Sequence, residues 1–427
     1  MSAPFLYRAY VTATAAAVPL AAYLETKKLR QAGVEIHRAH EKLGHATLER
    51  RGAGPLIWFH AASVGESVSV LSLITRMGQS LPRAHFLITS GTATSAQIVA
   101  KRMPPRCVHQ FAPLDAPGPI KRFLKHWRPD AAIFVESELW PQMLRRTHAS
   151  GARMALLNAR LSERSVARWA RRPVESRYVL EVFDLILTQN DKMAEAMVAM
   201  HAPADRVARG SNLKALSAPL AIDESALNAA RDALGSRPLW VASSTHAGEE
   251  ETALAAHKIL LKRWPDLHLI LAPRHPARGD AVAQLIADAG LCATRRSKGD
   301  APGEQVYLAD TLGELGTWYA LSDIVFLGGS LLPIGGHNPF EVAQAGAAVL
   351  SGPYVTNFAE TFAAMQTADA VQIVANTKEL SSALNDLLGD TKKRMKMQTA
   401  STEFAHAGSD ALDRIAERLI KILQLTP

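Results

Sequence analysis

From residue 56 onward, short apolar runs alternate along the chain with stretches in which apolar positions recur every three to four residues. This alternation is typical of β-strands separated by amphipathic helices. In the first half the runs that predict strands begin at Leu56 and continue at residues 85–90, 108–111, 131–136, 153–158 and 184–188. In the second half they lie at residues 239–243, 267–272, 305–308, 323–327 and 347–350. The pattern predicts an α/β protein whose sheets are mostly parallel, with helices on both faces.

A chain of 427 residues is longer than one hydrophobic core normally supports, so two domains are expected. We expect two Rossmann-like domains facing across a cleft, the first over residues 31–212 and the second over residues 224–427. The crossover between them is expected at residues 213–223, which contain Pro219 and several small residues. The last helices, from about Ala411, belong to the second domain in this division but could pack back on the first.

The N-terminal segment, residues 1–30, is expected to associate with a membrane. Residues 9–24 are uncharged and rich in alanine, and Lys27, Lys28 and Arg30 follow them. Sixteen helical residues reach about 24 Å, which is short of a hydrocarbon core of about 30 Å. A helix lying in the membrane surface, with its basic end on the cytoplasmic side, is therefore favoured over a spanning helix. The alternative is an ordinary alanine-rich helix on the body of the protein.

Charge is distributed unevenly. Residues 1–209 contain 29 Lys and Arg against 16 Asp and Glu, and the remainder contains 19 against 24, which gives a net charge of +8. A basic first half favours an anionic partner. No zinc-finger spacing, RNP-type segment or helix-turn-helix is recognisable, so nucleic acid is not an expected partner and anionic lipid or phosphate is. Cys107 and Cys292 have no neighbours spaced as zinc ligands, and no metal or other cofactor is expected.

The first candidate site follows the apolar run that starts at Leu56. Residues 63–66 (SVGE) predict a tight turn into a helix, and in parallel sheets such a turn lies at the carboxyl end of a strand, where ligands bind. Glu66 would lie at that edge. The spacing also fits a simpler interpretation, in which Ser63 caps the helix and Glu66 is only a first-turn acid.

Three further strand-to-helix transitions carry polar groups. Glu136 and Glu138 follow an apolar run directly and precede Trp140 and Pro141, so they should share the edge with Glu66; helix capping is the alternative. Residues 243–249 (SSTHAGE) offer hydroxyls that could cap a helix or contact an anion. Residues 272–276 (APRHP) hold Arg274 and His275 between two prolines, which suits contact with a phosphate or carboxylate.

A glycine-rich stretch gives the strongest ligand signal in the second half. Residues 328–330 (GGS) and 335–341 (GGHNPFE) combine close-approach glycines with Asn338 as a helix cap, Pro339 at the first helical position and Glu341 at the third. Such a helix start offers N–H groups to a phosphate, and its carboxylate can accept from ribose hydroxyls. The stretch matches neither the dinucleotide fingerprint nor the P-loop, which argues against a dehydrogenase and a nucleoside triphosphatase.

Taken together, these motifs resemble those of the 3-deoxy-D-manno-octulosonic acid (Kdo) transferases of lipid A assembly, which are glycosyltransferases of family 30 with the two-domain GT-B fold. The resemblance runs in family order from about residue 56 to about residue 360. It rests on residues 62–66 (ASVGE), 111–115 (FAPLD), 136–141 (ESELWP), 212–214 (NLK), 244–249 (STHAGE), 272–276 (APRHP), 310–315 (DTLGEL), 328–330 (GGS) and 336–341 (GHNPFE). Gln142 and Phe340 depart from the residues usual at their positions, Asn and Leu respectively.

The resemblance implies transfer of Kdo from CMP-Kdo to the lipid A precursor (lipid IVA), with inversion and without a metal, at the cytoplasmic face of the inner membrane. By matching positions, Glu66 would be the proton acceptor, Glu136 would support the transition state and Lys214 would stabilise the leaving group. The segments that would contact CMP contain Arg274, His275, Leu312, Gly313, Glu314, Asn338, Pro339, Phe340 and Glu341.

Two rival functions remain at this stage. A nucleotide-sugar epimerase or hydrolase on the same fold would convert its substrate without a lipid acceptor, since the fold alone does not decide the reaction. A membrane-associated module that binds acidic lipid through its basic half would need no CMP site. The number of Kdo residues transferred, the acyl pattern of the acceptor and the oligomeric state are not written in any motif.

Overall fold

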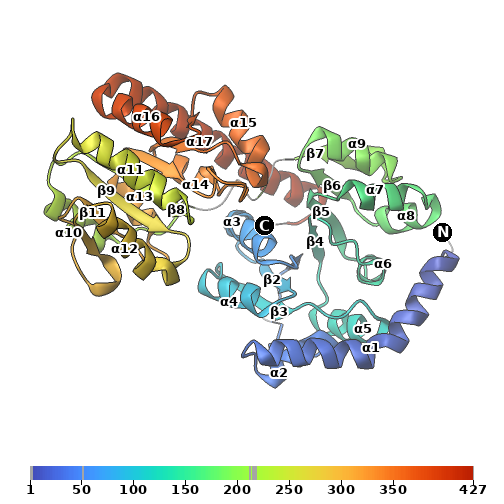
Figure 1. The fold of residues 1–427 in the computed structure, drawn as a ribbon. Helices are drawn as coiled ribbons and strands as arrows, with labels where there is room; N and C mark the ends of the chain where they lie inside the picture. Colours follow the sequence, from blue (N-terminus) through green and yellow to red (C-terminus); the bar gives the residue numbers. More distant parts are fainter. Residues whose placement is uncertain (1–2, 51, 211–212, 214–218, 427) are drawn as a thin grey trace. The chain divides into compact units, whose positions relative to one another are not determined.

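The computed structural model describes residues 3–50, 52–210, 213 and 219–426. It divides the chain into two compact units, residues 1–217 with 410–427, and residues 218–409. We call these unit 1 and unit 2. The expected parallel α/β architecture is confirmed in each of them (Figure 1).

Unit 1 contains a seven-stranded parallel sheet with strand order β3-β2-β1-β4-β5-β6-β7. The strands are β1 (Leu56–His60), β2 (His85–Ser90), β3 (Cys107–Phe111), β4 (Ala131–Val135), β5 (Arg153–Ala159), β6 (Leu185–Thr188) and β7 (Val207–Arg209). The central strands β1 and β4 are buried along their whole length, as expected of a sheet covered on both faces. The helices are α1 (Phe5–Gln31), α2 (Ile36–Ala39), α3 (Val64–Ser80), α4 (Ala93–Lys101), α5 (Pro117–Trp127), α6 (Pro141–Ala149), α7 (Glu163–Ala170), α8 (Pro173–Leu180) and α9 (Asp191–Ala199).

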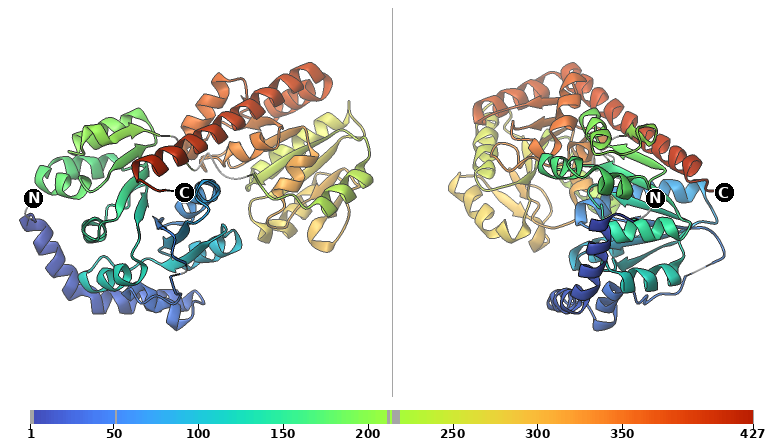
Figure 2. Two further views of the ribbon diagram at one scale, coloured as in Figure 1. Left: turned by 180° about the vertical axis from the view of Figure 1, so that it is seen from behind. Right: turned by 90° about the vertical axis from the view of Figure 1, so that its right-hand side faces the viewer.

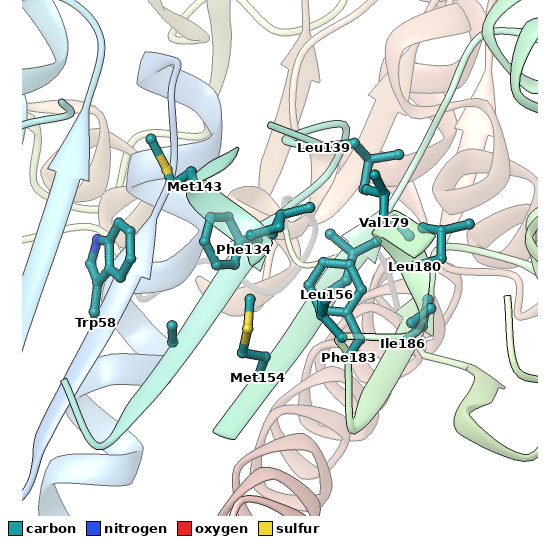
Figure 3. Close-up of a cluster of buried hydrophobic side chains, with 14 of the residues drawn as sticks. Trp58, Phe134, Leu139, Met143, Met154, Leu156, Val179, Leu180, Phe183 and Ile186 are labelled. Atoms are coloured by element: carbon teal, nitrogen blue, oxygen red, sulfur yellow. The ribbon is translucent and has the colours of Figure 1, made fainter. Parts of the chain in front are cut away.

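A hydrophobic cluster fills the space between one face of this sheet and the helices α5, α6, α8 and α9. Figure 3 shows Phe134 of β4, Leu156 of β5 and Ile186 of β6 among its members. Trp58 of β1 belongs to the same cluster and packs edge-on against Phe134, with ring centroids 5.3 Å apart. This packing fixes the strands whose carboxyl ends carry the predicted catalytic acids.

Unit 2 repeats the architecture with strand order β10-β11-β9-β8-β12-β13-β14, again parallel throughout. Its strands are β8 (Leu239–Thr245), β9 (His268–Pro273), β10 (Ala293–Arg295), β11 (Val306–Leu308), β12 (Ile324–Leu327), β13 (Ala348–Ser351) and β14 (Val371–Ile373). Its helices are α10 (Glu224–Leu234), α11 (Glu249–Leu261), α12 (Gly279–Asp288), α13 (Leu315–Leu321), α14 (Pro339–Gln344), α15 (Ala359–Thr367) and α16 (Thr377–Gly389). The last helix, α17 (Thr391–Ile422), starts in unit 2, and its residues from Asp410 onward group with unit 1.

The N-terminal helix α1 is long and bent, lies against α5 and is held to the rest of unit 1 by polar contacts (Figure 2). The Tyr10 hydroxyl donates to Asp115 at 2.8 Å, and the Gln142 side chain donates to Thr14. Large apolar side chains on α1 remain exposed, including Leu20, Tyr23 and Leu24, which are 64%, 63% and 53% exposed. Within the described residues, no helix combines the length and apolar character needed to cross a membrane.

Candidate functional site

The loops after β1, β4, β8 and β12, which are expected to carry chemistry, flank the points where the strand orders of the two sheets reverse. In unit 1 this point falls between β1 and β4, and in unit 2 between β8 and β12. Ligands of open α/β sheets bind outside the carboxyl ends of the strands at such a reversal. Glu66 follows β1 and Glu136 follows β4, so the sheet brings these two predicted residues to the same edge.

Glu66 lies in the first turn of α3 and is only 7% exposed. Its carboxylate accepts hydrogen bonds from the Ala62 N–H at 2.9 Å and the Ser63 hydroxyl at 2.8 Å. The Ser63 oxygen accepts in turn from the Glu66 N–H at 3.3 Å, so the capping contact expected from the spacing is present. Capping alone does not require a carboxyl group to be buried to this extent.

The surroundings of Glu66 favour its protonated form. Burial raises the pKa of its carboxyl group, although the hydrogen bond from Ser63 partly offsets this effect. The negative charges of Glu138 and Glu136 raise the pKa of Glu66 further. Raising the pKa of a carboxyl group makes its carboxylate a stronger base. Such a carboxylate is better suited to take a proton from a hydroxyl group near neutral pH.

Glu136 is held in an unusual backbone conformation by its neighbours. Its φ is +57°, in the left-handed region that non-glycine residues rarely adopt, and Asn158 at the end of β5 has a φ of +54°. The Asn158 amide donates to the Glu136 carboxylate at 3.2 Å, and its oxygen accepts from the Leu213 N–H at 3.2 Å. Asn158 therefore connects Glu136 to the residue that precedes Lys214 in sequence. Lys214 itself lies outside the described residues.

Glu138, two residues further along, is paired with His60 at the end of β1. The His60 Nε2 atom lies 3.2 Å from Glu138 Oε2, and the Trp140 indole N–H donates to the same oxygen at 2.5 Å. Burial on its own would raise the pKa of Glu138, but these hydrogen bonds and the proximity of His60 hold it below the ordinary value. Glu138 is therefore an anion at neutral pH. His60 is buried and contacts polar groups through both ring nitrogens.

In unit 2 one buried carboxylate organises the glycine-rich loop. Glu249, the first residue of α11, is fully buried, and its oxygens accept from the N–H groups of Gly329, Ser330 and Leu331 at 2.6–2.8 Å. It also accepts from the His246 N–H at 3.0 Å. The sequence placed Glu249 at a helix start but gave no sign of this role, because its partners lie about 80 residues away in the chain.

Two histidines pair directly beside this loop. The Nε2 atoms of His246 and His337 lie 3.1 Å apart, and the planes of the two rings are nearly parallel, with an interplanar angle of 8°. Burial, with the nearby charge of Arg274, lowers the pKa of His337 to about 4, and burial also lowers the pKa of His246. Both rings are thus neutral at pH 7, and one nitrogen of the pair donates to the other. A side chain at Gly329 (φ +68°) would meet the His337 ring at 2.7 Å, so the pairing requires glycine there.

The residues predicted to contact CMP lie in loops at the same edge of the unit 2 sheet. Arg274 and His275, after β9, are exposed to solvent. Leu312 is 74% exposed in the loop after β11, next to Gly313, which has a φ of +87°. Glu314 accepts from the Arg296 guanidinium at 2.6 Å, and this contact holds its pKa below the ordinary value although burial acts in the opposite direction.

At the start of α14 the predicted residues divide into polar and packing positions. Asn338 caps the helix by accepting from the Phe340 N–H at 3.1 Å, and Pro339 occupies the first helical position, as the sequence predicts. Pro339 and Phe340 are buried, and the Phe340 ring packs against Phe404 at 6.1 Å. The Glu341 side chain is half-buried. Across the described residues, no three His, Cys, Asp or Glu side chains gather as a metal site would require.

Comparisons with known proteins show the family of the chain. Residues 37–217 match the family model of 3-deoxy-D-manno-octulosonic-acid transferase. A protein of Arabidopsis thaliana named "Probable 3-deoxy-D-manno-octulosonic acid transferase, mitochondrial" is 34% identical, with 93% of this chain and 92% of the relative covered. The 3-deoxy-D-manno-octulosonic acid transferase of Haemophilus influenzae is 32% identical, with 86% and 87% covered.

Solved structures share the fold. A UDP-GlcNAc 2-epimerase from Neisseria meningitidis superposes with a TM-score of 0.55 at 14% sequence identity, with 86% of this chain and all of the epimerase covered. That likeness concerns the fold of two parallel-sheet α/β domains, which epimerases and GT-B glycosyltransferases have in common. The sequence relatives separate the two classes, and on their evidence the chain belongs to the family of Kdo transferases.

Proposed function

We propose that this Kdo transferase moves one or more Kdo residues from CMP-Kdo to the lipid A precursor (lipid IVA) in lipopolysaccharide synthesis, with inversion and without a metal. The observation that carries the proposal is the buried Glu66 carboxylate at the carboxyl end of β1, with its pKa raised by burial and by two neighbouring acids. A glycosyl transfer of this kind needs one group to accept the proton of the acceptor hydroxyl.

In the proposed reaction the acceptor oxygen attacks the anomeric carbon of Kdo from the face opposite the phosphate. The new carbon–oxygen bond forms as the bond to the CMP phosphate breaks, and CMP leaves with the electron pair. The hydroxyl proton goes to Glu66. Lys214 would stabilise the charge on the departing CMP, a role assigned by sequence position alone. Glu136 would orient a cation or a sugar hydroxyl, because a carboxylate close to the leaving phosphate would repel it.

The donor would bind at the carboxyl edge of the unit 2 sheet. Arg274 is exposed there and can pair with the phosphate, while the neutral rings of His246 and His337 leave the site without additional positive charge. The loop of residues 312–314 and the start of α14 would contact the nucleoside. Glu249 fixes the backbone of the glycine-rich loop through its N–H groups, so we assign it a positioning role.

The proposal is tested by following CMP release from freshly generated CMP-Kdo with and without the bisphosphorylated lipid acceptor. A transferase releases CMP at a rate that depends on acceptor concentration. Conversion of the donor at the same rate without acceptor would instead support the epimerase or hydrolase. No conversion in either arm, with the protein bound to anionic lipid, would support the non-catalytic module.

The raised pKa of Glu66 predicts a pH dependence. The base must be ionised to accept a proton, so the rate falls as the pH drops through its pKa. Because that pKa is raised, the acid limb of kcat/KM should lie above the value of about 4.3 of an ordinary glutamate. The limb should be missing from the residual activity of Glu66→Gln. A limb at the ordinary value, or one that persists in the variant, would contradict this assignment.

Helix α1 would hold the enzyme at the cytoplasmic face of the inner membrane. Leu20, Tyr23 and Leu24 form an exposed apolar stripe, and Lys27, Lys28 and Arg30 lie exposed or nearly so at the C-terminal end of the helix. Apolar contact and attraction to anionic headgroups would then act together, as reversible membrane binding generally requires.

Replacing Lys27, Lys28 and Arg30 by alanine should weaken binding to anionic vesicles about 100-fold at low salt, from about 1 kcal/mol per basic residue. Co-sedimentation with phosphatidylglycerol vesicles measures this directly. The matched control replaces three exposed lysines of unit 2, Lys298, Lys378 and Lys392, by alanine, which removes the same charge elsewhere. Equal weakening by both triple variants would show that only the net charge matters and would refute a role for α1.

A further inference from the structure

Trp140, beside the catalytic edge of unit 1, is exposed although it is a large aromatic residue. Its side chain is 43% exposed at the point where the loop after β4 enters α6. The indole N–H is not available to a ligand, because it donates to Glu138. What Trp140 offers to solvent is therefore mainly the apolar face of its ring.

Glu138 is oriented by a chain of buried hydrogen bonds that starts in the core. The Trp58 indole can only donate, and it donates to the Thr89 hydroxyl at 2.8 Å. Thr89 lies 2.9 Å from His60 Nδ1 and 3.4 Å from its other acceptor, the Phe59 carbonyl, so its own proton points best to His60. Accepting at Nδ1 leaves the His60 proton on Nε2, from which it is donated to Glu138.

Both of these donors use a single oxygen of Glu138. His60 and Trp140 each donate to Oε2 and not to Oε1. No described residue donates to Oε1, and this oxygen reaches solvent although Glu138 as a whole is only 8% exposed. A carboxylate fixed through one oxygen thus keeps the other as a hydrogen-bond acceptor next to the exposed indole face.

We propose that Glu138 and Trp140 form a sugar-binding subsite, in which a pyranose ring of the acceptor packs on the indole and donates a hydroxyl hydrogen bond to Glu138 Oε1. A sugar presents an apolar face of C–H groups with hydroxyls at its rim, which matches an aromatic ring beside a fixed acceptor. The acceptor is the sugar concerned because Glu138 is close enough to Glu66 to influence its ionisation, and Glu66 would take the acceptor's proton. His60 is a positioning residue that acts through Glu138.

This inference rests on the proposed function, so its test uses binding as well as turnover. The probe is the bisphosphorylated sugar backbone of the acceptor without acyl chains, whose affinity for the full chain is measured by calorimetry. Glu138→Gln and Trp140→Ala should each weaken binding by about tenfold or more, the loss expected for a hydrogen bond to a charged group or for an aromatic contact. The KM for the lipid acceptor should rise by the same factor, while CMP affinity stays unchanged.

Two further variants separate binding from structural effects. Trp140→Phe keeps an aromatic face and should retain more affinity than Trp140→Ala. Glu163→Gln, at an exposed acid that pairs with Lys192, should leave affinity and KM unchanged. Native affinity in both Glu138→Gln and Trp140→Ala would overturn the subsite, as would a rise in the KM for CMP-Kdo alone. Failure of the native protein to transfer Kdo would instead overturn the proposed function, and the binding data would still decide the subsite.

Discussion

Replacing Glu66 by glutamine should lower kcat for Kdo transfer by at least about 100-fold, within the range of a lost general base. Glutamine has nearly the same shape, and its carbonyl oxygen can still accept from Ala62 while its amide contacts Ser63. The helix cap is therefore largely kept, and only the ability to accept a proton is lost. Acceptor-dependent CMP release, measured with both substrates saturating, gives kcat for the native protein and the variant.

Two controls make this result specific to the base. Calorimetry should show the same CMP affinity for Glu66→Gln as for the native protein, because the residues that we propose to bind CMP lie in unit 2. Glu195→Gln, at an exposed acid of α9, should have native kcat. If Glu66→Gln turned over at the native rate, Glu66 would be a helix-capping acid and the base would have to be sought elsewhere.

The second large effect is expected at Glu249. Replacing it by glutamine puts an amide donor against N–H groups that the carboxylate now satisfies, since glutamine offers one acceptor atom for four donors, two of them in buried hydrogen bonds and two in partly buried ones. An unsatisfied buried donor costs about 1–3 kcal/mol, so the unfolding free energy should fall by at least about 2 kcal/mol. The glycine-rich loop would lose its fixed conformation, and CMP affinity should fall at least about tenfold as the loop has to be ordered on binding.

Glu251→Gln is the matched control for this variant, because Glu251 lies on the same helix but is exposed and accepts from the Gly248 N–H at the helix start. Because the glutamine carbonyl can still accept from the Gly248 N–H, the change should cost about 1 kcal/mol or less, with native CMP affinity. Denaturant unfolding and calorimetry on the two variants measure both quantities. Equal CMP affinity in Glu249→Gln and Glu251→Gln would show that the hydrogen bonds from the glycine-rich loop to Glu249 do not organise the proposed CMP site.

Alternating apolar runs were sufficient to predict most strands of both sheets, because a strand buried on both faces must be apolar along its length. Three strands were not predicted, β7, β10 and β14. Each has three residues and forms the edge of its sheet, where one side of the strand has no neighbour and most side chains are exposed or half-buried. A pattern that reports burial cannot find a strand that is only partly buried.

The candidate site was predictable where its residues lie directly after strands, as with Glu66, Glu136 and Arg274. It was not predictable where a role depends on contacts between distant segments. Asn158 of β5 donates to Glu136, which follows the neighbouring strand β4, and His60 of β1 contacts Glu138 in the same loop. Glu249 accepts hydrogen bonds from a loop about 80 residues away in the chain. The spacing of residues along the sequence does not indicate such contacts, because they form only when the sheet brings the strand ends together.

The measurement that tests the central claim most directly is the mass of the lipid after the native protein has been incubated with CMP-Kdo and the bisphosphorylated lipid A precursor. The account predicts a lipid heavier by one or more Kdo residues, and the mass also gives the number transferred. An unchanged lipid mass, with the donor shown to be intact at the end of the incubation, would contradict transfer to this acceptor.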